Sequence, residues 1–398
     1  MNAIARLKAY RGPVLLSYGF RPFFLFGAIY AALAVLAWLP ILNGRLELWT
    51  AFGAVDWHVH EMLYGFLPAV ITGFLLTAIP NWTGRLPIQG RPLLALVLLW
   101  LAGRVAVTFS AEIGWLAAGL IDVAFLAMVV AATTREIIAG SNWRNLKVVG
   151  LVALLLAGNI AFHLEAHIRG SAEYGTRVGI AVTVMLIAII GGRIVPSFTR
   201  NWLVRENPGR LPVPFARFDV MVILFSAATL ALWCVLPSGQ VTAAMLAIAG
   251  VLHVVRMLRW AGDRTGRDRL VLILHVGYLF VPLGFLLAAA GAAGFVMADA
   301  GIHAWMVGAA GVMTLAVMTR ASLGHTGKAL VATPATQMIY AAVVVAALAR
   351  ICLAVEPRWG SQLLDLSAIA WCAAFFGFVV VFGPLLLGSR RQSMEVEG

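Results

Sequence analysis

Long runs of apolar residues, separated by short polar links, follow one another from one end of this chain to the other. A helix that crosses a membrane needs about 20 consecutive, mostly apolar residues. Runs of that length, bounded by proline, glycine or charge, predict an all-α polytopic membrane protein with about 12 transmembrane helices. The predicted spans are 20–39, 60–79, 91–109, 113–134, 147–168, 177–199, 217–236, 240–260, 270–292, 302–319, 334–354 and 363–387.

The composition agrees with this pattern. The 398 residues are 62% hydrophobic and 12% charged, whereas a soluble domain carries about 25% charged residues. No polar block is long enough to form a separate soluble domain. We therefore expect one integral-membrane domain, 1–398, with short cytoplasmic tails at 1–19 and 388–398.

The net charge of +12 raises the question of nucleic-acid binding, but the basic residues lie between apolar runs rather than on one face of a folded domain. We therefore expect a lipid bilayer and no nucleic acid as partner. Lys and Arg number 21 in the links on the N-terminal side of the membrane and five on the other side. By the positive-inside rule, this bias predicts that both termini are cytoplasmic.

Five of the eight histidines fall at the predicted periplasmic ends of three spans. His58 and His60 lie in "DWHVHEMLYGF", His163 and His167 in "AFHLEAHIRG", and His303 in "GIHAWMVG". A single interfacial histidine is usually a satisfied polar side chain, but ionisable groups gathered at membrane depth mark functional sites. We expect spans 2, 5 and 10 to meet, so that some of these five residues bind metal.

The spacing of these histidines leaves alternatives open. His163 and His167 are four residues apart and project from one helix face, so both can bind one metal, or one can hydrogen-bond behind the other. His58 and His60 are about 200° apart on a helix. They reach one centre only if the helix entry is unwound, and otherwise they serve two partners.

The residue types narrow the choice of metal. Cys234, Cys352 and Cys372 stand alone in or near apolar segments, without a CxxC pair, so thiolate sites are not expected. Imidazole-rich sites suit copper, iron or zinc, and imidazole is the usual axial ligand of haem. On the opposite side, His253 and His275 fall at similar depths, and we expect them to form an electron-transferring bis-imidazole haem site.

Other polar residues complete the predicted site. We expect Asp56, Glu61 and Glu165 to relay protons. Arginines in or beside the spans are candidates to complement haem propionates. Their alternative roles are pairing with an acid in the membrane, such as Asp122 or Asp219, or reaching out to the interface. These candidates are Arg21, Arg104, Arg193 and Arg320.

Several segments resemble the NnrS family: "LSYGFRPFFLFGAIYA" from Leu16, "WHVHEMLYGFLPAVITGFLLTAIPNWTGR" from Trp57, "GGRIVPSFTRN" from Gly191 and "VMTRASLGHTGK" ending at Lys328. The resemblance implies a bacterial inner-membrane protein that carries haem and copper and is associated with denitrification and resistance to nitric oxide. It does not say which histidine holds which metal. Haem–copper oxidases also have twelve spans, but spans 6 and 7 of this chain contain no histidine, which argues against direct membership.

These observations predict a protein that binds or reduces nitric oxide near the periplasmic face, with copper and with haem that we expect to be b-type. If it is an enzyme, it is an oxidoreductase similar to nitric oxide reductases, whose donor is a quinol or a cytochrome. The alternatives are a secondary transporter, which predicts broken helices at the bilayer midplane, or haem and copper handling without turnover.

A weak internal similarity accompanies these predictions. "HEMLYGF" and "HAWMVGA" open spans 2 and 10, and "IPNWTGR", "SFTRNW" and "MTRASLG" follow spans 2, 6 and 10. These segments fit three units of four helices. Gly and Thr are common in membrane helices, so we attribute the similarity to chance.

Overall fold

The computed structural model describes residues 10–388 of the chain. Within that range it contains 12 helices long and apolar enough to cross a membrane, and no strand. The predicted fold class and number of spans are therefore confirmed. Parts of the predicted tails, residues 1–9 and 389–398, lie outside the described residues.

Nine spans contain one α-helix each, that of α8 being preceded by the short 3-10 helix η3 (Trp143–Asn145), and three contain a π-helical segment between two α-helices. The nine α-helices are α2 (Phe20–Leu42), α5 (Arg91–Thr108), α7 (Trp115–Ala139), α8 (Leu146–Arg169), α11 (Arg217–Val235), α12 (Gln240–Leu258), α13 (Arg269–Ala292), α16 (Pro334–Val355) and α17 (Gly360–Leu387). Span 2 joins α3 (Ala54–His60), η2 (Glu61–Phe66) and α4 (Leu67–Thr83). Span 6 joins α9 (Tyr174–Leu186), η4 (Ile187–Gly191) and α10 (Gly192–Glu206), and span 10 joins α14 (Asp299–His303), η6 (Ala304–Gly311) and α15 (Val312–His325).

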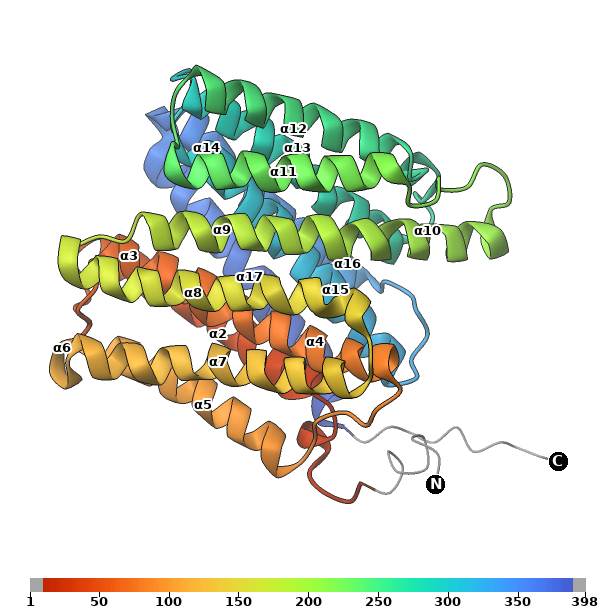
Figure 1. Ribbon diagram of the computed structural model, residues 1–398, viewed down its shortest axis with the longest axis horizontal. Helices are drawn as coiled ribbons and strands as arrows, with labels where there is room; N and C mark the ends of the chain where they lie inside the picture. The colour runs from red at the N-terminus through yellow and green to blue at the C-terminus, as the bar shows by residue number, and fades with distance from the viewer. Residues whose placement is uncertain (1–9, 389–398) are drawn as a thin grey trace.

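Helices that follow one another in the chain mostly pack side by side, and the last span returns to the first (Figure 1). The start of α2 and the end of α17 are tied together, since Arg21 Nη1 donates to the carbonyl oxygens of Leu386 at 2.7 Å and Gly388 at 2.9 Å. These carbonyls have no partner within their own helix end. Both ends of the membrane domain therefore lie on one side, which we call the terminal side; the other is the far side.

Spans 2, 6 and 10 share a local structure. Each contains a π-helical segment, η2, η4 or η6, and each is longer than predicted, at 30, 33 and 27 residues. They are also central, because α9 of span 6 contacts both η2 and η6. π-Helical turns inside longer helices often occur at functional sites. Their recurrence in every fourth span agrees with the three units of four helices that the internal similarity fits.

The outward faces of the bundle carry large apolar side chains. Leu120, Ile168, Leu224, Val241 and Val380 are each at least 64% exposed. Such a surface is stable against lipid, while the backbone polar groups are satisfied within each helix. The protein is thus a multi-pass membrane protein, and its buried polar groups are the candidates for function.

Candidate metal site

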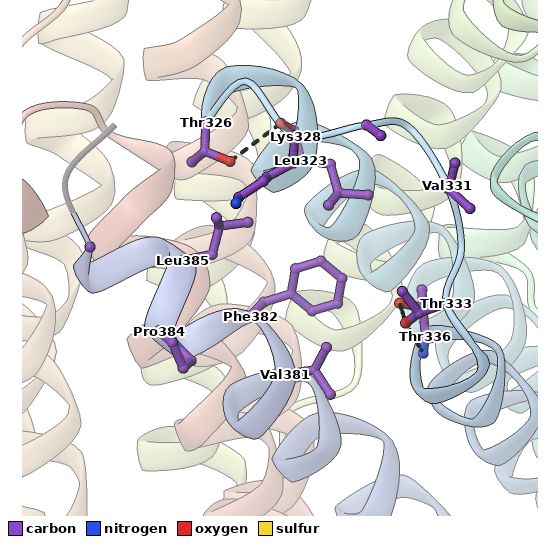
Figure 2. A pocket seen from close by; sticks show the side chains of 12 residues that line it. Leu323, Thr326, Lys328, Val331, Thr333, Thr336, Val381, Phe382, Pro384 and Leu385 are labelled. Carbon is purple, nitrogen blue, oxygen red and sulfur yellow. Dashed lines mark hydrogen bonds between the residues drawn. The ribbon is translucent and has the colours of Figure 1, made fainter. Parts of the chain in front are cut away.

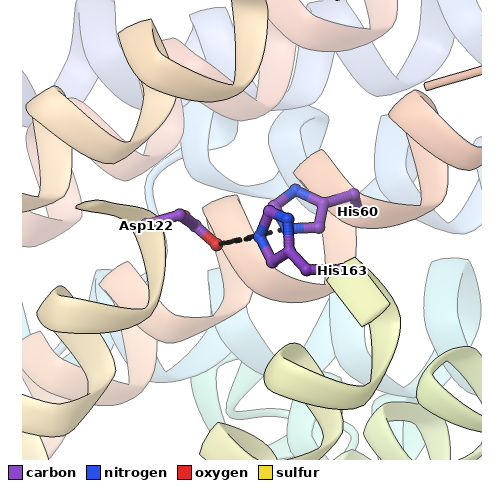
Figure 3. A group of neighbouring side chains, drawn as sticks. All are labelled: His60, Asp122 and His163. Carbon is purple, nitrogen blue, oxygen red and sulfur yellow. Dashed lines mark hydrogen bonds and ion pairs between the residues drawn. The ribbon is translucent and has the colours of Figure 1, made fainter. Parts of the chain in front are cut away.

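Three candidate ligands meet at the far side of the bundle (Figure 3). The two histidines were predicted as ligands from the sequence, and the aspartate was not. His60 ends α3, Asp122 lies in the first half of α7, and His163 lies near the end of α8. One ligand atom from each residue lies within 4.8 Å of the other two, and all three residues are buried. The sequence places these residues at one depth because odd spans end, and even spans begin, on the far side.

One carboxylate oxygen is the meeting point of the cluster. Asp122 Oδ2 accepts from His163 Nε2 at 3.0 Å and from Asn159 Nδ2 at 2.8 Å. It also lies 3.2 Å from His60 Nε2, a nitrogen that is 3.1 Å from Asn159 Oδ1. The three candidate ligand atoms are Asp122 Oδ2 and the two Nε2 atoms.

A second carboxylate lies behind His60. The Nδ1 atom of His60 donates to Glu61 Oε1 at 2.8 Å. Arg104 Nη1 donates to both oxygens of Glu61, at 2.7 and 2.6 Å, and Tyr30 donates its hydroxyl hydrogen to Oε2. Arg104 Nη2 also donates to Asp122 Oδ1. A histidine that binds metal through one nitrogen commonly donates the other N–H to a carboxylate, which orients the ring.

Glycine allows the arginine to reach this position. A Cβ atom at Gly65, within η2, would lie 2.5 Å from Arg104 Nη1. Because real Cβ atoms do not approach that closely, a larger residue would displace the guanidinium from Glu61. The glycine in "HEMLYGF" is therefore part of the site.

The charges of the cluster favour a bound cation. Glu61 and Asp122 bring two carboxylates to a buried region where Arg104 is the arginine that pairs with them. Buried charges of one sign need compensation. Two carboxylates face one arginine here, so one negative charge is left over, and a bound metal ion would compensate it.

The donor set fits a single metal ion. Two imidazoles and one carboxylate with open positions are the ligand set of non-haem iron, and imidazole also suits copper. Phe162 and Phe52 enclose the cluster, with ring centroids 5.1 Å from His60 and 5.5 Å from His163, respectively. This packing suits an ion bound among the three side chains rather than a macrocycle. The cluster is compatible with metal binding.

A second pair of histidines lies apart from this cluster. His58 stacks on Trp38 with ring centroids 4.0 Å apart, and its buried Nδ1 has no hydrogen-bond partner among the described residues. His303 Nδ1 donates to the carbonyl of Asp299 at 2.8 Å, which leaves Nε2 free to act as a ligand. His303 interacts electrostatically with His58 and with Arg350.

Four of the five far-side histidines thus form two separate pairs rather than one group. Because α3 is already helical at Ala54, His58 and His60 point to two different partners, as the second of our alternatives required. Spans 2 and 5 meet at the cluster, with spans 3 and 4 in addition. His303 of span 10 lies near His58 of span 2. Spans 2, 5 and 10 therefore do not meet at one centre as expected: span 2 meets span 5 at the cluster and span 10 at His58.

The remaining far-side predictions lie at the edge of the site. His167 is exposed and stacks on Trp115 at 4.0 Å between ring centroids. Glu165 accepts from the backbone N–H of Tyr174 at 3.2 Å and Gly175 at 2.7 Å, and so caps the start of α9. Asp56 lies beside the backbone of Ala172. A proton relay through Glu165 and Asp56 remains a prediction.

On the terminal side, each of the two predicted haem ligands has a hydrogen-bond partner. His253 Nε2 donates to Ser226 Oγ at 3.0 Å, and its Nδ1 accepts from the Tyr278 hydroxyl at 3.1 Å. His275 Nε2 donates to Thr199 Oγ1 at 2.8 Å. The two histidines lie on adjacent helices, α12 and α13. Haem ligation by this pair remains a prediction, and it would require His253 to give up one of these bonds.

The predicted propionate partners have protein partners of their own. Arg104 pairs with Glu61 and Asp122, which is the alternative role that we considered, and Arg21 holds the end of α17. Arg193 Nη1 donates to Asn145 Oδ1 at 3.0 Å, and Arg320 lies over the ring of Phe198. Propionate binding by these arginines remains a prediction.

Sequence reasoning missed Asp122 as a ligand and did not consider Asn159 or Tyr30. Asp122 appeared only as a partner for arginine, although a lone acid within an apolar run is itself a signal of a functional site. Asn159, in "LLLAGNIAFHLE", lies one helical turn before His163 on the same face. Tyr30 carries no such signal.

A cavity lies elsewhere, at the terminal side between α15 and α17 (Figure 2). Its volume is about 670 Å³, and Lys328, Thr333 and Phe382 are among its lining residues. It is therefore not part of the metal site.

Comparison with known proteins places the chain in a family. No curated protein and no solved structure matches it. A family model described as "NnrS protein" matches residues 14–390, which is nearly the whole chain. With this match and with the buried histidine and aspartate cluster inside the matched region, the chain belongs to the NnrS family.

Proposed function

We propose that this protein binds nitric oxide at a metal ion held by His60, Asp122 and His163. The observation that carries the proposal is the buried set of two imidazoles and one carboxylate, backed by a second carboxylate. Membership of the NnrS family supports a role connected with nitric oxide. We propose copper or iron as the ion, and a physiological role in nitric oxide metabolism or defence against nitrosative stress.

The surrounding residues prepare the site for a metal. Glu61 accepts the Nδ1 hydrogen of His60 and so directs the other nitrogen of the ring toward Asp122. Arg104 holds Glu61 and Asp122 at once and prevents the two carboxylates from separating. Phe52 and Phe162 pack against the rings of His163 and His60. When bound, the ion would supply an open coordination position for a small ligand.

Glu61 is also the best placed proton carrier of our three candidates. Its Oε2 accepts from the Tyr30 hydroxyl, and its Oε1 accepts from His60 Nδ1. A proton can therefore be held between Tyr30 and the ligand histidine without leaving the buried region. This arrangement supports reduction, which consumes protons, as well as simple binding.

We propose that His58 and His303 would hold a b-type haem. The unpartnered Nδ1 of His58 and the Nε2 of His303, left free by the bond to Asp299, are two ligand atoms from spans 2 and 10. Arg350 interacts electrostatically with both rings and would offset propionate charge. Bound haem would supply one-electron transfer.

We further propose that the protein lies in the bacterial inner membrane as one integral-membrane domain. The tethering of α2 to α17 supports both termini on one side, and the excess of Lys and Arg there supports the cytoplasm. A fusion of alkaline phosphatase, which is active only in the periplasm, in the link around Arg264 should be inactive.

The transporter alternative has less support. It predicts broken helices near the midplane. Each of the twelve described spans is instead continuous, with π-helical segments inserted in three of them. The buried charges on the far side are paired with one another around candidate ligands.

Purified protein provides the test. Metal content should be stoichiometric, and nitric oxide added to the reduced protein should change the absorption or electron paramagnetic resonance spectrum of the bound metal. Substituting Gln for His60 and His163 together should abolish that change while a haem spectrum remains. If a metal-loaded protein gives no response to nitric oxide, the proposed function is wrong.

A further inference from the structure

A second cavity lies at the terminal side of the central spans, and the metal site makes no use of it. Its volume is about 300 Å³, and it is lined by residues of α2, α4, α10, α13 and α15. That size is at the lower limit of typical small-molecule sites, about 300–1,000 Å³. We propose that it binds the head group of a membrane quinol or quinone.

Arg320 provides the first argument. Its guanidinium lies 4.1 Å from the centroid of the Phe198 ring, and its buried Nη1 has no hydrogen-bond partner among the described residues. No acid among residues 10–388 makes a salt bridge with it. Asp268 interacts with it electrostatically, but the Asp268 carboxylate accepts from the backbone of α13. A buried N–H of a charged group without a partner is costly, so an oxygen atom of a ligand is expected at this position.

The other lining residues indicate the shape of that ligand. Phe24, Phe74 and Phe198 supply aromatic rings, and Asn81 supplies an amide. The Asn81 Nδ2 atom makes one long bond of 3.4 Å to the carbonyl of Thr77, which leaves its Oδ1 available as an acceptor. A flat ring would pack between these phenyl groups. One of its oxygen atoms would accept a hydrogen bond from Arg320, and another would hydrogen-bond with the Asn81 amide.

The position of the cavity supports the same conclusion. The three similar segments "IPNWTGR", "SFTRNW" and "MTRASLG" each contribute to its lining, through Asn81, Phe198 and Arg320. The ends of spans 2, 6 and 10 therefore converge here, at the terminal side of the bundle. A phosphate of an anionic lipid fits the more polar cavity beside Lys328 better (Figure 2).

The assignment deepens the proposed function, because it rests on that function for the role of the ligand as electron donor. Oxidation of one quinol to the quinone releases two electrons and two protons. Reduction of two nitric oxide molecules to one nitrous oxide and one water takes up the same number of each.

Binding of decylubiquinone to the purified full-length protein tests the inference without nitric oxide. Trp82 lies next to Asn81 and packs on Phe74 with ring centroids 6.4 Å apart, so a bound quinone should quench its fluorescence. R320Q should weaken binding about tenfold or more, since it removes a charged hydrogen-bond donor. A321F should weaken it by filling the cavity while it keeps the charge. K328Q, in the other cavity, should bind as the wild type does, and W82F should reduce the quenching but not the affinity.

Several results would overturn the inference. The first is a lack of saturable binding to the wild-type protein, and the second is a wild-type affinity in both R320Q and A321F. The third is displacement of the quinone by phosphatidylglycerol at equal concentration. The last is loss of haem in R320Q. The last would show that Arg320 holds a propionate. Metal content and the response to nitric oxide are measured separately from quinone binding. Absence of quinone binding would therefore not contradict the proposed metal site, and absence of a response to nitric oxide would not contradict quinone binding.

Discussion

Two buried clusters of this protein are built from nearly the same parts and differ in what they can bind. The far-side cluster pairs Arg104 with Asp122 beside His60, and the terminal-side cluster pairs Arg256 with Asp219 beside His253. Each also lies against a π-helical segment. Arg104 packs on Gly65 of η2, and Arg256 Nη1 donates to the carbonyl of Ala188 in η4 at 2.9 Å.

The difference is the balance of charge. On the far side two carboxylates, Glu61 and Asp122, share one arginine. On the terminal side one carboxylate, Asp219, is shared by Arg256 at 3.0 Å and Arg259 at 3.3 Å. The first cluster therefore has an excess of negative charge that a cation relieves, and the second has an excess of positive charge that repels one.

The histidines respond to these surroundings. The ring nitrogens of His60 face carboxylate and amide oxygens. Those of His253 face hydroxyl groups in a linear chain of hydrogen bonds. In this chain Arg256 donates to Tyr278, Tyr278 donates to His253, and His253 donates to Ser226. A histidine buried beside an arginine is thus no evidence of a metal site until the carboxylates around it are counted.

Removal of the aspartate should separate the clusters most strongly. D122A and D219A each break a buried ion pair, and each should lower stability by about 3–5 kcal/mol. Only D122A should also abolish metal binding. Thermal unfolding in detergent and metal analysis by mass spectrometry measure the two effects. A D122A protein with its full metal content would contradict the comparison.

Removal of a histidine should affect metal alone. H163Q takes away one of three ligands, and we expect metal affinity to fall by more than about 100-fold. Loss of a residue that only hydrogen-bonds to a ligand costs about 10–100-fold. The matched change, H253Q, should leave metal at the far side unchanged. Competition with a chelator of known affinity provides the measurement. Equal losses in the two variants would show that the two clusters are not distinct.

The second carboxylate should contribute less than a ligand does. E61Q keeps the shape of the side chain but removes the charge that orients His60, and metal affinity should fall about 10–100-fold. Y30F, which removes one hydrogen bond to the same carboxylate, is the milder control. If E61Q binds metal as tightly as the wild type, the negative excess at this site has no role in holding the ion.

The smallest effect is expected at His167. Its ring is exposed and stacks on Trp115, and an aromatic contact of this kind contributes about 0.5–1.5 kcal/mol. H167A should therefore shift the unfolding temperature slightly and retain all bound metal, in contrast to H163Q one turn earlier. Loss of metal in H167A would show that the ion lies nearer His167 than the cluster of His60, Asp122 and His163.

The sequence was sufficient to predict the twelve spans, because a membrane helix depends on local apolar content and on length. It also indicated that polar residues of "DWHVHEMLYGF" and "AFHLEAHIRG" meet, since both segments reach the far side at one depth. The lengths of spans 2, 6 and 10 were underestimated, because their polar ends, such as Asn81 and Arg205, extend the helices beyond the apolar run.

Depth is one coordinate, and the position of a residue around the bundle is another. The sequence determined the depth of each histidine, but helix packing decided that His163 faces Asp122 while His167 faces Trp115. Packing likewise sent His60 toward α7 and α8, and left His58 on Trp38 with His303 near by. Asp122 became a ligand candidate only when α5, α7 and α8 had been brought together, because a charge balance belongs to neighbours in space and not to neighbours in sequence.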